Sequence, residues 1–404
     1  MSNSLYSGSG PALTAVGTPL VVGVDIGVSE GGVWLYSYRW WVPTGGDTES
    51  GQLFCLYQIT GTDSGTLIPN STATGGTLTA DAWNVIPLPS PLLLAPSYNP
   101  PLADDIGTTY GAAYMACTGK QFVNGFPEAK SVFGSGDPDS GGITSGPLYA
   151  FSSLSGTNPA GSAASPQWIP QCPYTTELTD PTAGMPTQND TDANLGMDVV
   201  VDTIAPAGAS YRMLPNAPVF VVPGVSAQEQ AYTLGLAFTL SEACTLDAIW
   251  HYSPSGSTVL PSRCGIWNAN TQTQVSGTDN SSPSWSGAAG SGWVSCSYSG
   301  PVLPAGEYVV STFTSAETSP WFLAQVDWWD TAFPSGITAG PIEFTGTQYH
   351  LGNTWTYPAT TGAEFDGLDV QVTPSSSAAA GAGGVAGVAD DEMNWSKLRF
   401  LGVV

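Results

Sequence analysis

Residues 292–311 read GWVSCSYSGPVLPAGEYVVS and combine a strand that opens with a tryptophan, a Gly-Pro turn and an apolar strand that contains a tyrosine. A related pattern lies within residues 82–115. Trp293 follows Trp83 by 210 residues (293 − 83), and the prolines of the two turns are separated by the same interval. A constant interval indicates a duplicated unit, and internal repeats decide architecture.

Four further pairs of strand-like segments recur in the same order along the chain. The first pair alternates apolar residues, as a strand with one buried face does. The last pair is separated by only 171 residues (369 − 198), which predicts that the first copy carries about forty residues that the second copy lacks. The pairs are 19–30 with 234–242, 33–41 with 245–252, 54–58 with 264–268, and 196–201 with 367–372.

Length and composition agree with this organisation. A chain of 404 residues fits two domains. Its 49 Gly and 33 Pro argue against long helices, and short runs of Val, Thr, Tyr and Trp between turn residues are typical of all-β sandwiches. We therefore predict an all-β protein with two tandem jelly-roll-like β-sandwich domains, at residues 19–205 and 219–374.

The remaining segments are predicted to be connections and ends. Residues 1–18 are small and polar and are expected to form an arm, and residues 206–218 a linker. The first domain should contain a long insertion at about 118–190. Residues 375–392 have the Ser/Ala/Gly composition of a flexible linker, and 393–404 form an apolar peptide that we expect to dock on a partner. The apolar docking residues are Trp395, Leu398, Phe400 and Leu401.

The charge balance excludes some classes of partner. The chain has 32 acidic residues, only seven Lys and Arg, and a formal net charge of −25. Neither nucleic acid nor an anionic membrane is an expected partner, because both attract basic proteins. The first residues lack the pattern of a signal peptide, and no apolar run is long enough to span a bilayer. The lack of a signal-peptide pattern favours buried thiols over disulfides for the six cysteines.

No motif predicts catalysis, and we expect no catalytic residue, cofactor or metal. His251 lies in an aromatic strand and is interpreted as a structural side chain. Residues 137–142 loosely resemble a calcium loop but lack its spacing and its closing glutamate. Asp198 and Asp369 recur at equivalent positions and are expected to cap a turn or to pair at a sheet end.

Aromatic residues in adjacent pairs are candidates for stacking on sugar rings. Neighbouring side chains on a strand point to opposite faces, so at most one ring of each pair should be exposed. The candidates are Trp321, beside Phe322, and the pairs Trp328 with Trp329 and Trp40 with Trp41.

Both copies resemble a family of jelly-roll modules of unknown function, found in bacterial surface proteins and in minor tail proteins of actinobacterial phages. The second copy carries the pattern in Gly235…Phe238, Gly292-Trp293, Ala305-Gly306-Glu307-Tyr308 and Leu368-Asp369-Val370. The first copy matches less well, because Trp83 lacks the preceding glycine. The resemblance implies a β-sandwich and, by association only, a role on a virion.

We therefore expect a non-enzymatic virion protein of a bacteriophage, similar to a minor tail protein and exposed on the particle exterior. Its expected partners are other virion proteins, further copies of itself and host-surface glycans. A capsid decoration protein and a secreted carbohydrate-binding adhesin are the alternatives. A polysaccharide-degrading enzyme is a third, and it would need two carboxylic acids in one cleft.

Overall fold

The computed structural model describes the larger part of the chain. The described residues are 2–4, 20–28, 30–42, 48–61, 64–98, 110–111, 114–120, 143–145, 147–150, 182, 197–215, 225–228, 230–315, 320–325, 329, 333 and 335–375.

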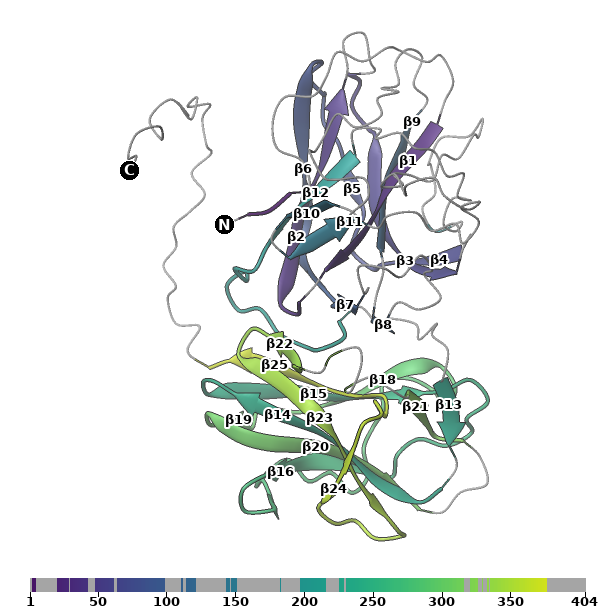
Figure 1. Cartoon of the computed structure of the whole chain (residues 1–404), viewed down its shortest axis with the longest axis vertical. Helices are drawn as coiled ribbons and strands as arrows, with labels where there is room; N and C mark the ends of the chain where they lie inside the picture. The colour runs from purple at the N-terminus through teal and green to yellow at the C-terminus, as the bar shows by residue number, and fades with distance from the viewer. Residues whose placement is uncertain are drawn as a thin grey trace, which may run out of the picture.

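These residues form antiparallel strands joined by turns, which confirms the predicted all-β class (Figure 1). The first half contains β1 (Leu20–Val28), β2 (Val33–Val42), β3 (Leu53–Gly61), β4 (Ser64–Leu67), β5 (Ala73–Thr74), β6 (Ala82–Leu94), β7 (Ser97–Tyr98), β8 (Tyr110–Gly111), β9 (Tyr114–Lys120), β10 (Ile143–Ser145), β11 (Leu148–Ala150) and β12 (Met197–Asp202). The second half contains β13 (Val225–Gln228), β14 (Tyr232–Leu240), β15 (Cys244–Ser253), β16 (Arg263–Asn268), β17 (Thr273–Gln274), β18 (Gly292–Ser297), β19 (Val302–Leu303), β20 (Gly306–Thr314), β21 (Phe322–Gln325), β22 (Ile337–Ala339), β23 (Ile342–Leu351), β24 (Thr360–Gly362) and β25 (Leu368–Pro374).

The two halves share one strand order. In the first half the larger sheet runs β10-β11-β1-β9-β3-β4, and in the second it runs β22-β23-β14-β20-β16-β17. The smaller sheets place β2 between β12 and β6, and β15 between β25 and the β18 and β19 segments. In each half the closing strand also contacts the larger sheet, β12 against β1 and β9, and β25 against β14 and β20.

The two hairpin tryptophans occupy corresponding strands. Trp83 on β6 lies opposite Trp41 of β2, and Trp293 on β18 lies opposite Tyr252 of β15. Both tryptophans are partly buried and pack against the hydrophobic core. The sequence interval therefore corresponds to matching positions in the two smaller sheets.

The alternating residues of β1 and β14 face the cores, as predicted. Val24, Ile26 and Val28 on β1 are at most 1% exposed. Leu236, Phe238 and Leu240 on β14 are equally buried, and Phe238 stacks on Tyr308 with ring centroids 5.6 Å apart. Large aromatic and branched side chains contribute most of the buried apolar area in such a core.

One residue from each of two predicted connections forms an isolated β-bridge with a sheet. Asn3, from the predicted arm, exchanges backbone hydrogen bonds with Val201 of β12. Tyr211, from the predicted linker 206–218, makes the same exchange with Val372 of β25. Each half thus adds a short segment, from before its first long strand, to the free edge of its closing strand. The backbone groups on that edge gain partners in this way.

The predicted insertion at about 118–190 contains two strands that have counterparts in the second half. Strands β10 and β11 lie inside this range, and β11 pairs with β1. β22 and β23 make the same hairpin beside β14 in the second half. This part of the range is therefore common to both halves and is not an insertion.

The recurrent aspartates of the closing strands are buried and paired with arginine. Asp369 is 0% exposed and accepts hydrogen bonds from Arg212 Nε at 3.2 Å and from the backbone N–H groups of Met213, Leu214 and Val370. Burial lowers the pKa of Arg212 to about 10, although Asp369 opposes this shift. The aspartate thereby fastens the segment after Tyr211 to β25.

The first half builds the same arrangement from a different place in the chain. Asp198 is also 0% exposed and pairs with Arg39 at 3.3 Å, but Arg39 lies on β2 itself, opposite Asp198. Its guanidinium lies 4.4 Å from the ring centroid of Trp83. In the second half the guanidinium of Arg212 lies 3.6 Å from Trp250 and 5.4 Å from Trp293. An arginine between a carboxylate and an indole thus occurs in each sandwich.

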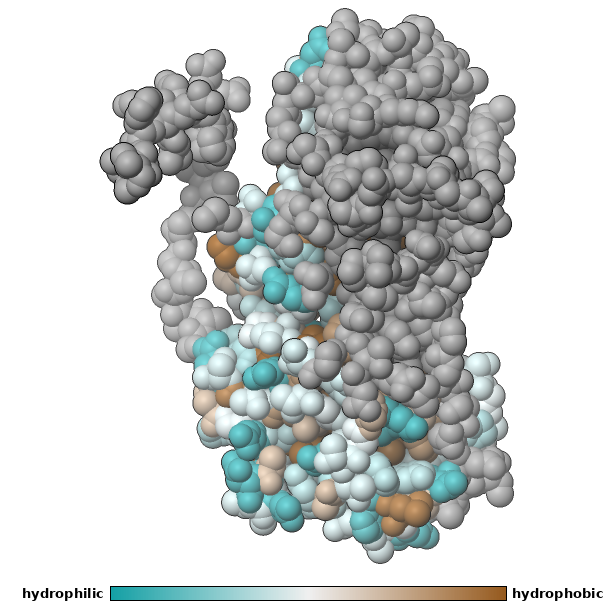
Figure 2. All heavy atoms as spheres, in the orientation of Figure 1, coloured by the Kyte–Doolittle hydropathy of each residue, from teal (hydrophilic) through white to brown (hydrophobic). Residues whose placement is uncertain are grey.

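The visible surface of the second half is mixed, with hydrophilic and neutral residues around small apolar areas (Figure 2). In the described part of the chain, four large apolar side chains are well exposed. They are scattered: Val85, Ile204, Val302 and Leu351. Single exposed apolar residues are ordinary on soluble domains and indicate no interface by themselves.

We expect Arg212→Met to lower the free energy of unfolding of the second sandwich by about 3–5 kcal/mol, because Asp369 would remain buried without its counter-ion. Urea unfolding at pH 7 followed by tryptophan fluorescence measures the change. The matched control is Arg263→Met, which removes the more exposed Arg263–Asp279 pair and should cost at most about 1 kcal/mol. Equal losses in the two variants would contradict a special role for the buried pair.

Candidate functional site

A pocket of about 520 Å³ opens in the second sandwich, between β14, β21, β23 and the segment that follows β24. We call it the Tyr232 pocket. A volume of this size is typical of sites for small ligands. It is lined by Tyr232, Leu234, Phe322, Thr347, Tyr349, Thr361, Gly362, Ala363, Glu364 and Asp366.

Strand pairing brings the aromatic rings of the pocket together. β14 and β23 are antiparallel neighbours, and Leu234 lies opposite Tyr349. The ring of Tyr232 meets Phe322 edge to face at 5.4 Å and Tyr349 edge to face at 5.9 Å. Phe322 is 3% exposed, whereas the two tyrosines are half-buried. The tyrosines therefore form an aromatic wall that a ligand can reach.

Two carboxylic acids complete the lining. Glu364 and Asp366 stand on either side of Phe365, whose side chain is fully buried. Glu364 is exposed, whereas Asp366 is only 5% exposed. No hydrogen bond links the carboxyl group of Asp366 to another described residue, and its oxygens face the open pocket and are not sealed from solvent. Burial raises the pKa of Asp366 well above its usual range, and the charge of Glu364 raises it further.

None of the described residues that line the pocket has a basic side chain. The three arginines in the described part of the chain each pair with another aspartate: Arg39 with Asp198, Arg212 with Asp369 and Arg263 with Asp279. A buried carboxyl group without a counter-ion or hydrogen bonds destabilises a fold, and such groups are concentrated at functional sites. This makes the Tyr232 pocket the strongest candidate site in the described chain.

The predicted sugar-stacking tryptophans do not form exposed platforms. The side chains of Trp40, Trp41, Trp321 and Trp329 are 2%, 4%, 0% and 6% exposed. Their ring faces are covered by the protein itself, because each indole contributes to a core. Neither ring is exposed in Trp40 with Trp41 or in Trp321 with Phe322, so neither pair offers a stacking platform. Trp328 lies outside the described residues.

Two of these tryptophans instead support the pocket from behind. Trp329 donates from Nε1 to Oγ1 of Thr347 at 2.8 Å and from its backbone N–H to the carbonyl of Ala363 at 3.2 Å. Trp321 packs edge to face on Phe322, with centroids 4.9 Å apart. They therefore hold three lining residues in position without touching the open space.

His251 is a structural residue, as its place in an aromatic strand predicts. It is 0% exposed, stacks on Trp321 and makes a 2.8 Å hydrogen bond between Nε2 and the carbonyl of Trp321. Burial lowers its pKa to about 4, so the imidazole is neutral near pH 7. His251 therefore packs behind Trp321, the residue that supports Phe322 in the wall of the pocket.

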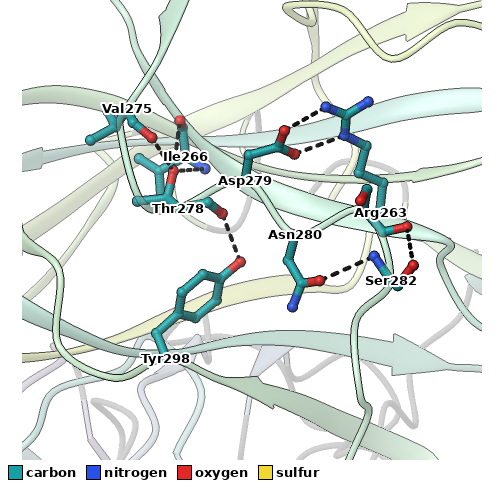
Figure 3. Close-up of polar contacts among 9 residues, drawn as sticks. Arg263, Ile266, Val275, Thr278, Asp279, Asn280, Ser282 and Tyr298 are labelled. Carbon is teal, nitrogen blue, oxygen red and sulfur yellow. Dashed lines mark hydrogen bonds and ion pairs between the residues drawn. The ribbon is translucent and has the colours of Figure 1, made fainter.

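A polar cluster around residues 275–282 is internally satisfied (Figure 3). Thr278 Oγ1 accepts from the N–H of Ile266 at 3.1 Å and donates to the carbonyl of Val275 at 2.8 Å, and the Tyr298 hydroxyl donates to the Thr278 carbonyl at 2.9 Å. Arg263 binds Asp279 through two nitrogens, at 2.8 and 2.5 Å. These hydrogen bonds hold the loop around residues 275–282 in place, and the polar groups that form them are already paired within the protein. We therefore assign the cluster a structural role.

The other sequence candidates carry no site in the described chain. No group of three or more His, Cys, Asp or Glu side chains suited to a metal occurs there, and residues 137–142 lie outside it. The described cysteines are buried thiols, with Cys55 and Cys117 facing each other at 3.4 Å between sulfur atoms. No helix in these ranges has the length and apolarity needed to cross a bilayer. The docking residues Trp395, Leu398, Phe400 and Leu401 lie outside the described residues.

Sequence reasoning missed Tyr232, Tyr349, Glu364 and Asp366. They come from three separate segments, and no spacing motif connects them. The one available signal was the run Gly362-Ala363-Glu364-Phe365-Asp366, where acids alternate with an aromatic residue just before the closing strand.

Comparison with known proteins adds no relative: no family model, no curated protein and no solved structure matches the chain. The chemistry of the site is therefore argued from its own residues.

We expect Asp366→Asn to stabilise the second sandwich by about 1 kcal/mol or more near pH 7. A group whose pKa is raised on folding contributes stability that is complete below its unfolded value, about 3.9, and is lost as the pH rises through the folded value. The variant should therefore match the wild type near pH 3.5 and exceed it increasingly above about pH 4. Thermal unfolding across this range tests the effect, with the exposed Glu343→Gln on β23 as control. A gain that does not depend on pH would contradict it.

Proposed function

We propose that the protein is a non-enzymatic structural protein on the exterior of a bacteriophage virion, and that its Tyr232 pocket binds a glycan of the host surface. The observation that carries the glycan-binding part is the combination of reachable tyrosine rings with an unpaired buried carboxyl group in one pocket. A minor tail protein is the form that we favour, and a capsid decoration protein or a secreted adhesin would use the same pocket.

The lining suits a saccharide. Aromatic rings provide flat apolar surfaces for the C–H faces of a sugar, while hydroxyl groups need acceptors and donors at the rim. Tyr232 and Tyr349 supply the rings, and Glu364, Asp366 and Thr361 supply the polar groups. An unpaired carboxyl group gains a hydrogen bond when a sugar hydroxyl enters, so binding relieves part of its burial cost.

Support for the virion location comes from the whole chain. Two halves with one strand order, stacked along the long axis of the molecule, give an elongated scaffold suited to an assembly (Figure 1). The formal net charge of −25 opposes contact with nucleic acid. The sequence resemblance to phage tail modules points in the same direction. Residues 393–404 are proposed to attach the protein to its neighbours.

One observation favours a second candidate, a glycoside hydrolase. Glu364 and Asp366 line the same pocket, and the buried acid has the raised pKa that a general acid requires. We favour binding, because alternate residues of one segment present both acids from the same wall, whereas glycosidase acids flank the bond that they cleave. Release of shorter fragments from a bound oligosaccharide would favour the enzyme instead.

We expect the full chain to bind saccharides on an array of bacterial cell-surface glycans, and Tyr232→Ala and Tyr349→Ala each to weaken binding about tenfold or more through loss of ring stacking. Tyr357→Ala is the matched control, because this half-buried tyrosine packs on Trp267 and lies outside the pocket. Absence of any glycan ligand, or equal binding by all three variants, would refute the glycan-binding proposal.

Deletion of residues 375–404 tests the proposed attachment. We expect the truncated chain to keep its folded sandwiches, because β25 ends at Pro374, and to lose incorporation into phage particles. Co-sedimentation of tagged protein with purified particles measures incorporation. Unchanged incorporation would remove the docking role of Trp395, Leu398, Phe400 and Leu401.

A further inference from the structure

The charge distribution in the Tyr232 pocket narrows the class of its ligand. Glu364 and Asp366 both carry a negative charge when ionised, and the described lining contains no Lys, Arg or His to offset them. The other titratable groups in this described lining are the hydroxyl groups of Tyr232 and Tyr349. If Asp366 is to ionise in its buried position, the compensating positive charge therefore has to come from the ligand.

We propose that the pocket selects a sugar that carries a free amino group, with the ammonium held between Glu364 and Asp366 and the sugar ring against Tyr232 and Tyr349. This inference rests on the proposed glycan-binding function and names the substrate class of the same site.

An ammonium group satisfies the acids better than a hydroxyl group does. It offers three N–H donors and a positive charge, whereas a hydroxyl offers one donor and no charge. Hydrogen bonds between charged partners are shorter and about twice as strong as neutral ones. An acidic sugar would be repelled by Glu364 and Asp366, and an acetylated amine would keep one N–H but lose the charge.

The aromatic wall favours the same ligand. Rings carry a negative potential over their faces, so an ammonium near Tyr232 or Tyr349 is attracted to the ring as well as to the carboxylates. Tyr232 is already fixed between Phe322 and Tyr349 by two edge-to-face contacts. Its position therefore requires no reorganisation when the ligand enters, which favours affinity.

The proton balance of binding is simple. The amine of the ligand enters protonated and keeps its proton, and any proton that the carboxyl group of Asp366 carries passes to the solvent as the ion pair forms. No bond other than O–H is broken, and no co-reactant is needed. Calorimetric titration in two buffers with different heats of ionisation measures this release.

The test compares three matched probes on the full chain: methyl glucosaminide, methyl N-acetylglucosaminide and methyl glucoside. Isothermal titration calorimetry at pH 7 and low salt measures each affinity. We expect the free amine to bind roughly tenfold or more tightly than the other two probes, the difference expected for a charge-assisted contact. Asp366→Asn and Glu364→Gln should each reduce that preference, whereas Glu343→Gln on the same sheet should retain it.

The outcomes separate this inference from the proposed function. Equal affinity for the three probes would overturn the amine preference and leave glycan binding standing. Failure of all three probes, and of the glycan array, would overturn both. A preference that survives in Asp366→Asn and Glu364→Gln would show that other residues recognise the amine, and it would overturn the site assignment.

Discussion

The structure depends on burying a carboxylate in each closing strand and supplying it with an arginine. Asp198 and Asp369 are both fully buried, and a lone charge in such a position would cost several kcal/mol. Two of the seven basic residues of the chain, Arg39 and Arg212, neutralise them. Because each arginine also lies over an indole ring, the pair joins the closing strand to a tryptophan of the smaller sheet, Trp83 in the first half and Trp250 in the second.

The arginine of this arrangement comes from a different part of the chain in each half. Arg39 stands on β2, directly opposite Asp198, so the first half pairs within its own sheet. In the second half the corresponding strand position is Trp250, opposite Asp369, and the arginine comes from the segment that connects the halves. The carboxylate of Asp369 also binds the N–H groups of Met213 and Leu214. The second ion pair thus orders the connection as well as the core.

The same electrostatic reasoning separates the acids that an arginine neutralises from the acid that lines the Tyr232 pocket. Asp198, Asp279 and Asp369 all have arginine partners, and their hydrogen bonds account for them. Asp366 is buried to nearly the same degree as Asp369 but has no such partner in the described chain, and it lines an open pocket. Natural proteins tolerate a destabilising group of this kind mainly where it serves binding or catalysis. The rigid aromatic packing beneath it, from Trp321 and Trp329, supplies the support that such a site needs.

The sequence by itself determined the all-β class, the positions of the main strands and the matching of Trp83 with Trp293, because strand periodicity and turn residues are local signals that a repeat displays twice. It also identified His251 as structural. It could not identify which tryptophans are covered, since burial of Trp40, Trp41, Trp321 and Trp329 depends on residues distant in the chain. Nor could it place Tyr232 beside Asp366, more than a hundred residues later, or join Arg212 to Asp369. Those contacts arise only when antiparallel pairing brings β14, β23 and β25 into one sandwich, and tertiary structure alone decided them.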